Sequence, residues 1–167
     1  NPPPRPNVEL KAAANVWKPR FKPHREVTAE AGATRQGMGD ADTTIRLRLC
    51  NEPGATSRVR QAVERVARAS NLTAEAIFDL KVAATEAVTN AIKGAPSNHA
   101  VEVAIAGGKN TVQVEVTDRG RFKPSYGPDT AREAEGGRGI PLMLALVDEV
   151  EFASFRNGTR VRLQRAS

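Results

Sequence analysis

The sequence is poor in the residues that form disulfides and metal clusters. Its 167 residues include one cysteine, Cys50, and two histidines, His24 and His99. One cysteine cannot form an internal disulfide, and two histidines are too few for most zinc sites. These absences exclude a disulfide-stabilised secreted scaffold and a structural zinc domain, and they predict a cytoplasmic protein.

Aromatic residues and long apolar runs are also scarce. Only 4% of the residues are aromatic, so the sequence offers no row of rings on which nucleic-acid bases could stack. The net charge of +6 comes from basic residues interleaved with acidic and apolar ones, which favours solubility and acidic protein partners over direct nucleic-acid binding. No apolar run approaches the ~20 residues of a membrane span, so no membrane association is expected.

The start of the chain is rich in proline and has no initiator methionine. The segment Asn1–Pro6 contains four prolines and lacks the apolar stretch of a signal peptide. Residues 1–43 are therefore predicted to be a basic tail or an interdomain linker with one short helix after Asn7, and residues 44–167 one folded domain. The missing methionine indicates that the chain is a piece of something longer.

From residue 44 onward, the hydrophobic pattern predicts an α/β domain of two layers. Helices are expected at 55–70, 73–93 and 140–147, and strands at 44–50, 100–105, 111–116, 149–155 and 159–163. Gly94 is predicted to cap the second helix, and Gly107–Asn110 to form a hairpin turn. The long irregular segment 118–135 is of a length that is usually functional inside a compact domain.

The second predicted helix carries a polar pair beside an apolar stripe. Glu86 and Asn90 are four residues apart, so they leave the same face of the helix about one turn from each other. A carboxylate can accept a proton or orient a hydroxyl, and an amide oxygen is a hard ligand suited to Mg²⁺. Taken alone, the pair also fits an ordinary solvated helix face.

A second candidate site follows a predicted strand, at Asp118-Arg119-Gly120. A carboxylate at a strand end could accept a hydrogen bond from an exocyclic amine such as that of adenine. Gly120 would let a ring approach the backbone. The alternative is an ordinary Asx turn.

A glycine cluster precedes the third predicted helix. Gly136, Gly137 and Gly139 permit a loop with free N–H groups, and the helix N-terminus that follows favours an anion. Arg138 within the loop would add a charged contact to a phosphate. A flexible loop before a helix is the alternative, but the ordered set of three motifs is much stronger evidence than any one of them.

In this order the motifs resemble the boxes of the GHKL ATPases and, more narrowly, those of bacterial anti-sigma factor serine/threonine-protein kinases. The resemblance covers roughly residues 44–165 and implies a Bergerat-type ATP-binding fold, a mixed and mostly antiparallel sheet covered on one face by helices. The matching segments are Glu86–Ala91, Asp118–Phe122, Gly136–Met143 and Asn157–Thr159.

The resemblance also implies a role for each matching residue. Glu86 would activate the attacking hydroxyl, and Asn90 would bind Mg²⁺ and the nucleotide. The remaining matches are Asp118 and Gly120 for adenine recognition, Gly136, Gly137, Arg138 and Gly139 for the phosphate-binding end of the lid, and Thr159 near the adenine pocket. Two positions depart from the family pattern, since Gly94 stands where histidine is common and Arg121 replaces a glycine of the adenine motif.

The function implied by the resemblance is a kinase that binds ATP and Mg²⁺. It would phosphorylate a serine of a STAS-type anti-anti-sigma factor, sequester an RNA polymerase sigma factor and form a homodimer. Three alternatives stay open. They are a non-catalytic nucleotide-binding module that captures a partner, the ATPase domain of a larger phosphatase-containing regulator, and the ATPase half of a sensor kinase. The last is disfavoured because His24 lies among prolines instead of on a long helix.

Overall fold

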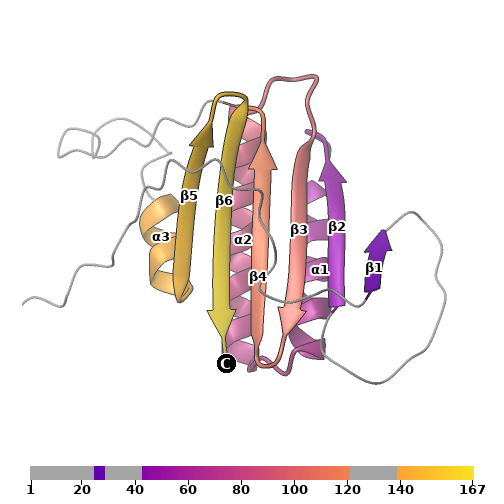
Figure 1. The fold of residues 1–167 in the computed structure, drawn as a ribbon, viewed down its shortest axis with the longest axis vertical. Helices are drawn as coiled ribbons and strands as arrows, with labels where there is room; N and C mark the ends of the chain where they lie inside the picture. The colour runs from indigo at the N-terminus through magenta and orange to yellow at the C-terminus, as the bar shows by residue number, and fades with distance from the viewer. Residues whose placement is uncertain (1–24, 29–42, 121–138) are drawn as a thin grey trace, which may run out of the picture.

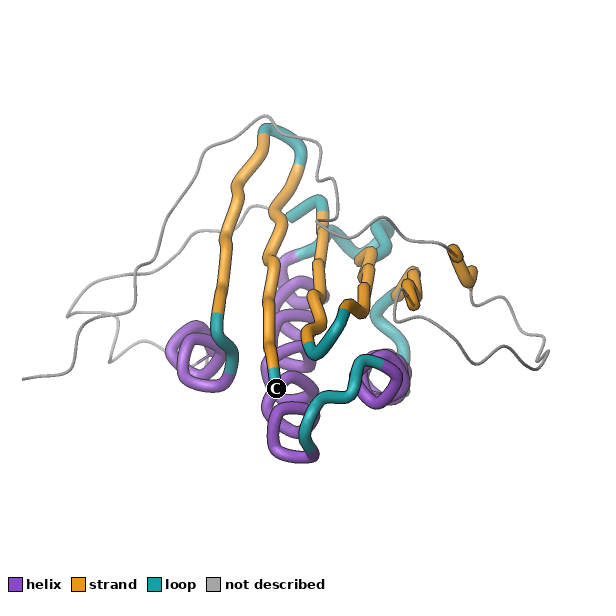
Figure 2. Tube along the Cα trace, turned by 60° about the horizontal axis from the view of Figure 1, so that its bottom comes forward, coloured by secondary structure: helices purple, strands orange, loops and turns teal. Residues whose placement is uncertain are grey.

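The computed structural model describes residues 25–28, 43–120 and 139–167. In this part of the chain six strands form one sheet in the order β1-β2-β3-β4-β6-β5, and three helices cover one of its faces (Figures 1 and 2). None of these helices has both the length and the apolar character needed to cross a membrane. The strands are β1 (Arg25–Thr28), β2 (Thr43–Leu49), β3 (Val101–Gly108), β4 (Thr111–Asp118), β5 (Glu149–Phe155) and β6 (Gly158–Ala166), and the helices are α1 (Ala55–Ala69), α2 (Ala74–Gly94) and α3 (Gly139–Leu146).

Strand pairing confirms the predicted fold class. β1 and β2 are parallel, whereas every other neighbouring pair in the sheet is antiparallel. Such a mixed, mostly antiparallel sheet with helices on one face is what the resemblance implied. The hydrophobic core lies between the sheet and the helices, and buried residues alternate with more exposed ones along much of β2 and β6. Its fully buried members include Leu49, Val63, Leu80, Val88, Ile105, Val114 and Leu163.

Helix α2 lies between α1 and α3 in the helical layer (Figure 2). It begins at Thr73, whose hydroxyl oxygen accepts a hydrogen bond of 3.2 Å from the Ala76 amide and so satisfies one free donor of the first turn. The face toward the sheet is built from small residues, including Ala83, Ala84 and Ala87, all of them buried. Because these side chains are short, the helix axis can approach the sheet closely.

The end of α2 corrects the prediction that Gly94 is the C-cap of this helix. Gly94 is the last helical residue, and the glycines with positive φ in the described part of the chain are Gly54 and Gly158. The C-cap is Ala95, in an extended conformation with ψ 143°. Ala95 precedes Pro96, and a following proline disfavours the helical conformation. Proline, not glycine, therefore ends this helix.

The β3–β4 hairpin is tighter than predicted. The paired positions continue through Gly107↔Val112 and Gly108↔Thr111, so the two glycines belong to the strand. The turn consists of Lys109 and Asn110, and Asn110 has a positive φ of 56°. Asparagine adopts this conformation more readily than most residues do, which explains why the turn sits two residues later than the glycine pair suggested.

Strand β1 lies inside the segment that was predicted to be a tail or linker. It pairs in parallel with the start of β2, from Arg25↔Thr43 to Thr28↔Arg46. A strand of four residues is too short to be recognised from an alternating hydrophobic pattern. Its partner, β2, is also separated from it in the sequence. The helix expected after Asn7 lies outside the described residues.

Deletion of residues 1–40 is expected to lower the melting temperature by only a few degrees. The deletion removes one short edge strand, and the prolines before it leave little apolar surface to bury. Differential scanning calorimetry should compare this variant with a deletion of residues 1–24, since only the longer deletion removes β1. A drop of about 10 °C or more in the protein that lacks residues 1–40 would contradict the prediction.

Candidate active site

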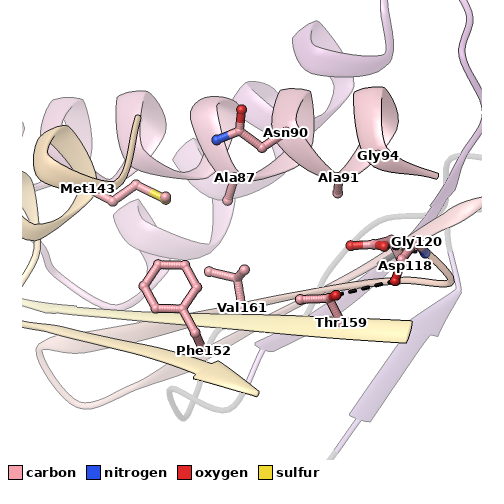
Figure 3. Close-up of a pocket in the computed structure, with 10 residues that line it drawn as sticks. All are labelled: Ala87, Asn90, Ala91, Gly94, Asp118, Gly120, Met143, Phe152, Thr159 and Val161. Carbon is pink, nitrogen blue, oxygen red and sulfur yellow. Dashed lines mark hydrogen bonds between the residues drawn. The ribbon is translucent and has the colours of Figure 1, made fainter. Parts of the chain in front are cut away.

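A pocket lies between the C-terminal half of α2, helix α3 and the β4–β6–β5 side of the sheet (Figure 3). The space between its lining atoms is about 490 Å³, including the part that is open to solvent. Its lining residues come from five elements and from the turn that follows β4. They are Ala87, Asn90, Ala91, Gly94, Asp118, Gly120, Met143, Phe152, Thr159 and Val161.

A buried carboxylate marks one end of this pocket. Asp118 is the last residue of β4, pairs with Thr159 of β6 and is 8% exposed. Its Oδ1 accepts a hydrogen bond of 2.6 Å from the Gly120 amide, whereas Oδ2 accepts none from the described residues. Burial raises the pKa of Asp118, and the Gly120 hydrogen bond opposes that shift. The Asx turn is therefore real, and it leaves one carboxylate oxygen available to a donor that enters the pocket.

Gly120 is required at its position by packing on α2. A Cβ atom there would overlap the Gly94 carbonyl oxygen at the end of α2. The Thr159 hydroxyl donates a long hydrogen bond of 3.4 Å to the Gly120 carbonyl (Figure 3). These contacts hold the turn between α2 and β6. They give a structural reason for this glycine in addition to the predicted approach of a ring.

Apolar side chains form the walls of the pocket away from Asp118. Ala87 and Ala91 of α2 face Phe152 and Val161 across the pocket, and Met143 of α3 lies at the end remote from Asp118 (Figure 3). Small residues on one wall and larger apolar ones on the other suit a flat ring. Sequence reasoning missed these residues. The signal was present at Ala87 and Ala91, which directly follow the polar pair and share its spacing of four.

The predicted polar pair forms beside the pocket. The Asn90 side-chain amide Nδ2 donates a hydrogen bond of 3.2 Å to Glu86 Oε1, and both side chains are partly exposed. This orientation leaves the Asn90 Oδ1 available as a ligand. Gly139, the first residue of α3, lies against the pair, because a Cβ atom there would overlap Glu86 Oε1 and lie 2.9 Å from Asn90 Nδ2. The N-terminus of α3 thus begins next to the polar pair.

The predicted site residues that the structure describes lie together. Asn90, Asp118, Gly120 and Thr159 line the pocket, and Glu86 and Gly139 contact Asn90 or lie against it. Gly136, Gly137, Arg138 and Arg121 lie outside the described residues. The functional role of each residue remains a prediction.

The oxygen donors at this site fit Mg²⁺ that arrives with a nucleotide. Among the described residues no group of three or more histidine, cysteine, aspartate or glutamate side chains could hold a metal alone. Mg²⁺ usually takes one or two protein oxygens and completes its octahedral shell with phosphate and water oxygens. Asn90 Oδ1, with the Glu86 carboxylate nearby, meets that requirement.

Replacing Gly139 with Ala is expected to weaken nucleotide binding by about 10-fold, because the added methyl group pushes Glu86 and Asn90 apart. The folding cost should be about 1–3 kcal/mol, as for other overpacked sites. Calorimetric titration with ATP and Mg²⁺, together with thermal unfolding, tests both effects. Ala145→Ser, on the exposed face of the same helix, is the control. Unchanged affinity in the Gly139 variant would show that α3 does not constrain the pair.

Comparison with known proteins agrees with this geometry. Residues 49–165 match the family described as the histidine kinase-like ATPase domain. The serine-protein kinase RsbW of Oceanobacillus iheyensis is 31% identical over 122 residues, which cover 65% of this chain and 77% of that protein. The protein of the same name from Bacillus velezensis is 32% identical over 124 residues, which cover 66% of this chain and 78% of that one.

A solved structure supports the same fold. The RsbU and RsbW domains of Rv1364c from Mycobacterium tuberculosis match with a TM-score of 0.58 at 22% identity, covering 74% of this chain. This chain spans 32% of that longer one. On the family match and the identity to these relatives, the chain belongs to the histidine kinase-like ATPase family and, within it, to the serine-protein kinases of the RsbW type.

Proposed function

We propose that this protein binds ATP with Mg²⁺ and transfers the terminal phosphoryl group to a serine of a protein acceptor. One observation carries the proposal. A single apolar pocket has a buried carboxylate, Asp118, at one end and the Glu86–Asn90 pair beside it. That arrangement suits a ligand that has two parts. One is a flat ring that donates a hydrogen bond, and the other is a charged group some distance from the ring.

At the adenine end, Asp118 would accept a hydrogen bond from the exocyclic amine. Its Oδ1 is held by the Gly120 amide, so Oδ2 is the oxygen that meets the ring. Guanine presents a carbonyl oxygen at the same place, and two acceptors would repel. The apolar walls at Ala87, Ala91 and Val161 would bury the faces of the ring and exclude water.

At the phosphate end, the protein would bind the phosphate groups with their Mg²⁺ and orient the serine hydroxyl of the acceptor. Bound Mg²⁺ and ATP supply the phosphoryl group and neutralise the charge that develops on it. Glu86 would accept a hydrogen bond from the incoming serine hydroxyl and take its proton, and Asn90 Oδ1 would serve as the protein ligand to the metal. Gly136, Gly137 and Arg138 are proposed to contact the phosphates together with Gly139.

The proposed acceptor is an anti-anti-sigma factor of the STAS type, and the proposed second partner is a sigma factor that the kinase sequesters as a homodimer in the cytoplasm. The RsbW relatives support a serine as the acceptor residue through their name as serine-protein kinases. The excess of basic residues, a net charge of +6, would attract acidic proteins.

A second candidate is the ATPase domain of a larger regulator. It is favoured by the Mycobacterium tuberculosis protein, whose solved structure contains RsbU and RsbW domains in a chain about three times as long as the match. In this case the phosphorylation chemistry would be the same, and residues 1–43 would be the interdomain linker.

Calorimetric titration with ATP, with and without Mg²⁺, followed by transfer of radiolabel from the γ-phosphate to purified STAS-domain proteins tests the proposal. We expect Mg²⁺-dependent binding and label on a serine. Binding without transfer to any of these proteins would favour a non-catalytic partner-capture module. Absence of nucleotide binding would refute the assignment of the pocket.

A further inference from the structure

Helix α2 carries a row of side chains that leads from solvent to the candidate active site. Phe78, Val82, Glu86 and Asn90 follow one another at intervals of four residues, and such positions lie on nearly the same helix face, ~6 Å apart along the axis. Phe78 is 64% exposed, more than any other large hydrophobic residue in the described part of the chain. The row therefore has an apolar outer half and a polar half at the pocket.

The helix surface between Val82 and the pocket offers few free polar groups. The hydroxyl groups of Thr85 and Thr89 donate hydrogen bonds of 2.7 and 2.8 Å to the carbonyl oxygens of Lys81 and Thr85, one turn back. Because both hydroxyl groups are satisfied by the backbone, these residues offer no strong polar group to a partner. A ligand that lies along α2 from Phe78 would meet the Val82 isopropyl group and the Thr85 side chain before it reaches Glu86.

Basic groups flank the same surface on the side of α1. Lys81, three residues after Phe78 on α2, has its Nζ 2.6 Å from Glu64 Oε2 of α1, and Arg68 Nη2 lies 2.7 Å from Glu64 Oε1. Two cations therefore share this one carboxylate. Arg60 and Arg65 are exposed on α1 and have no carboxylate partner among the described residues. The exposed Glu75 and the half-buried Asp79 also lie beside Phe78, and Asp79 is paired with Arg165 at 3.0 Å. Against Glu64 and Glu75, the cations of Lys81, Arg68, Arg60 and Arg65 still leave the flank positive, which complements an acidic polypeptide.

We propose that Phe78 and Val82 form the docking site for the protein acceptor of the phosphoryl group. The acceptor would place an apolar side chain on Phe78 and Val82, acidic residues toward Lys81 and Arg68, and its serine at Glu86. Eight residues separate Phe78 from Glu86, so the apolar anchor and the serine would lie ~12 Å apart. The inference rests on the proposed function, because it supplies the substrate-recognition surface for the same site.

The row of side chains on α2 leads directly to Glu86, and this distinguishes it from an exposed apolar patch elsewhere on the surface. A side chain bound at Val82 is one helical turn from Glu86, so docking and delivery of the hydroxyl would use adjacent positions of one rigid helix. The other exposed phenylalanine, Phe155 on β5, lies on the opposite face of the sheet with its ring 5.0 Å from the Arg160 guanidinium carbon. It has no such path to the pocket.

The test compares Phe78→Ser with Phe155→Ser, two exposed phenylalanines changed in the same way. The substrate is the STAS-domain protein that the parent labels when each purified candidate is offered in turn. We expect Phe78→Ser to raise the KM for that acceptor by about 10-fold or more with kcat nearly unchanged, and to leave ATP affinity by calorimetry unaltered. Phe155→Ser should match the parent, and the KM of the parent should rise with ionic strength.

Binding of the fluorescently labelled acceptor, followed by anisotropy with ADP present, gives a readout that is independent of catalysis. It should weaken by the same factor in Phe78→Ser. An unchanged KM and an unchanged anisotropy titration would overturn the docking site while the kinase assignment stands. A parent that labels no acceptor would overturn both. Loss of a dimer in sedimentation by Phe78→Ser, with an unchanged KM, would assign the surface to a second copy of the chain and overturn the proposal.

Discussion

Replacement of Glu86 with Gln is expected to leave nucleotide binding intact and to slow phosphoryl transfer by about 100-fold or more, the usual contribution of a positioned acid–base group. Gln has nearly the same size, and its side-chain oxygen can still accept the hydrogen bond that Asn90 donates to Glu86. The charge that orients a serine hydroxyl and takes its proton is lost. Single-turnover label transfer at saturating ATP measures the chemical step, and calorimetry measures binding.

Two further variants make this experiment selective. Glu102→Gln changes an exposed carboxylate on β3, away from the pocket, and should transfer label at the parental rate. Asn90→Ala should lose Mg²⁺-dependent binding and transfer together, because it removes the proposed metal ligand. Capture of a sigma factor should survive Glu86→Gln if it depends on surface shape. Equal transfer rates for the parent and Glu86→Gln would refute the catalytic role.

Local patterns explain why much of the fold and site was predictable. The alternation of Ile45, Leu47 and Leu49 with exposed arginines identifies β2 and its buried face. The spacing of Glu86 and Asn90 requires only that residues 74–94 be helical, and the apolar stripe ensures that. Local rules of this kind hold because neighbouring residues constrain one another before any tertiary contact forms.

The features that sequence reasoning missed depend on contacts between distant residues. The need for glycine at 120 comes from the Gly94 carbonyl, and no pattern within the segment after β4 reveals it. Phe152 and Val161 reach the pocket because β5 and β6 pair at that side of the sheet. The cap of α2 was misassigned for a local reason, because the effect of Pro96 on Ala95 outweighs the preference of glycine for a cap.

Replacement of Asp118 with Asn is expected to weaken ATP binding by about 10- to 150-fold, which corresponds to the ~1.5–3 kcal/mol of one charged hydrogen bond. The Asn oxygen can keep the hydrogen bond from the Gly120 amide, so the turn should persist. The remaining NH₂ group would face the adenine amine with a donor where an acceptor is needed. Glu102→Gln, an exposed carboxylate on β3, is the control, and equal ATP affinity for Asp118→Asn and the parent would show that Asp118 does not read adenine.

Although Asp118→Asn should weaken ATP binding, it should not lower the stability of the nucleotide-free protein. Burial raises the pKa of Asp118, so the folded state binds its proton more tightly than the unfolded state does. The favourable contribution of the protonated carboxyl is present at low pH and is lost as the pH rises through the raised pKa. Asparagine stays neutral throughout. Above that pKa the Asp118→Asn variant should therefore unfold at a temperature no lower than the parent, and the two melting curves should converge as the pH falls. If the variant melts well below the parent at neutral pH, the Asp118 carboxylate stabilises the folded protein, and its main role is not to bind a ligand.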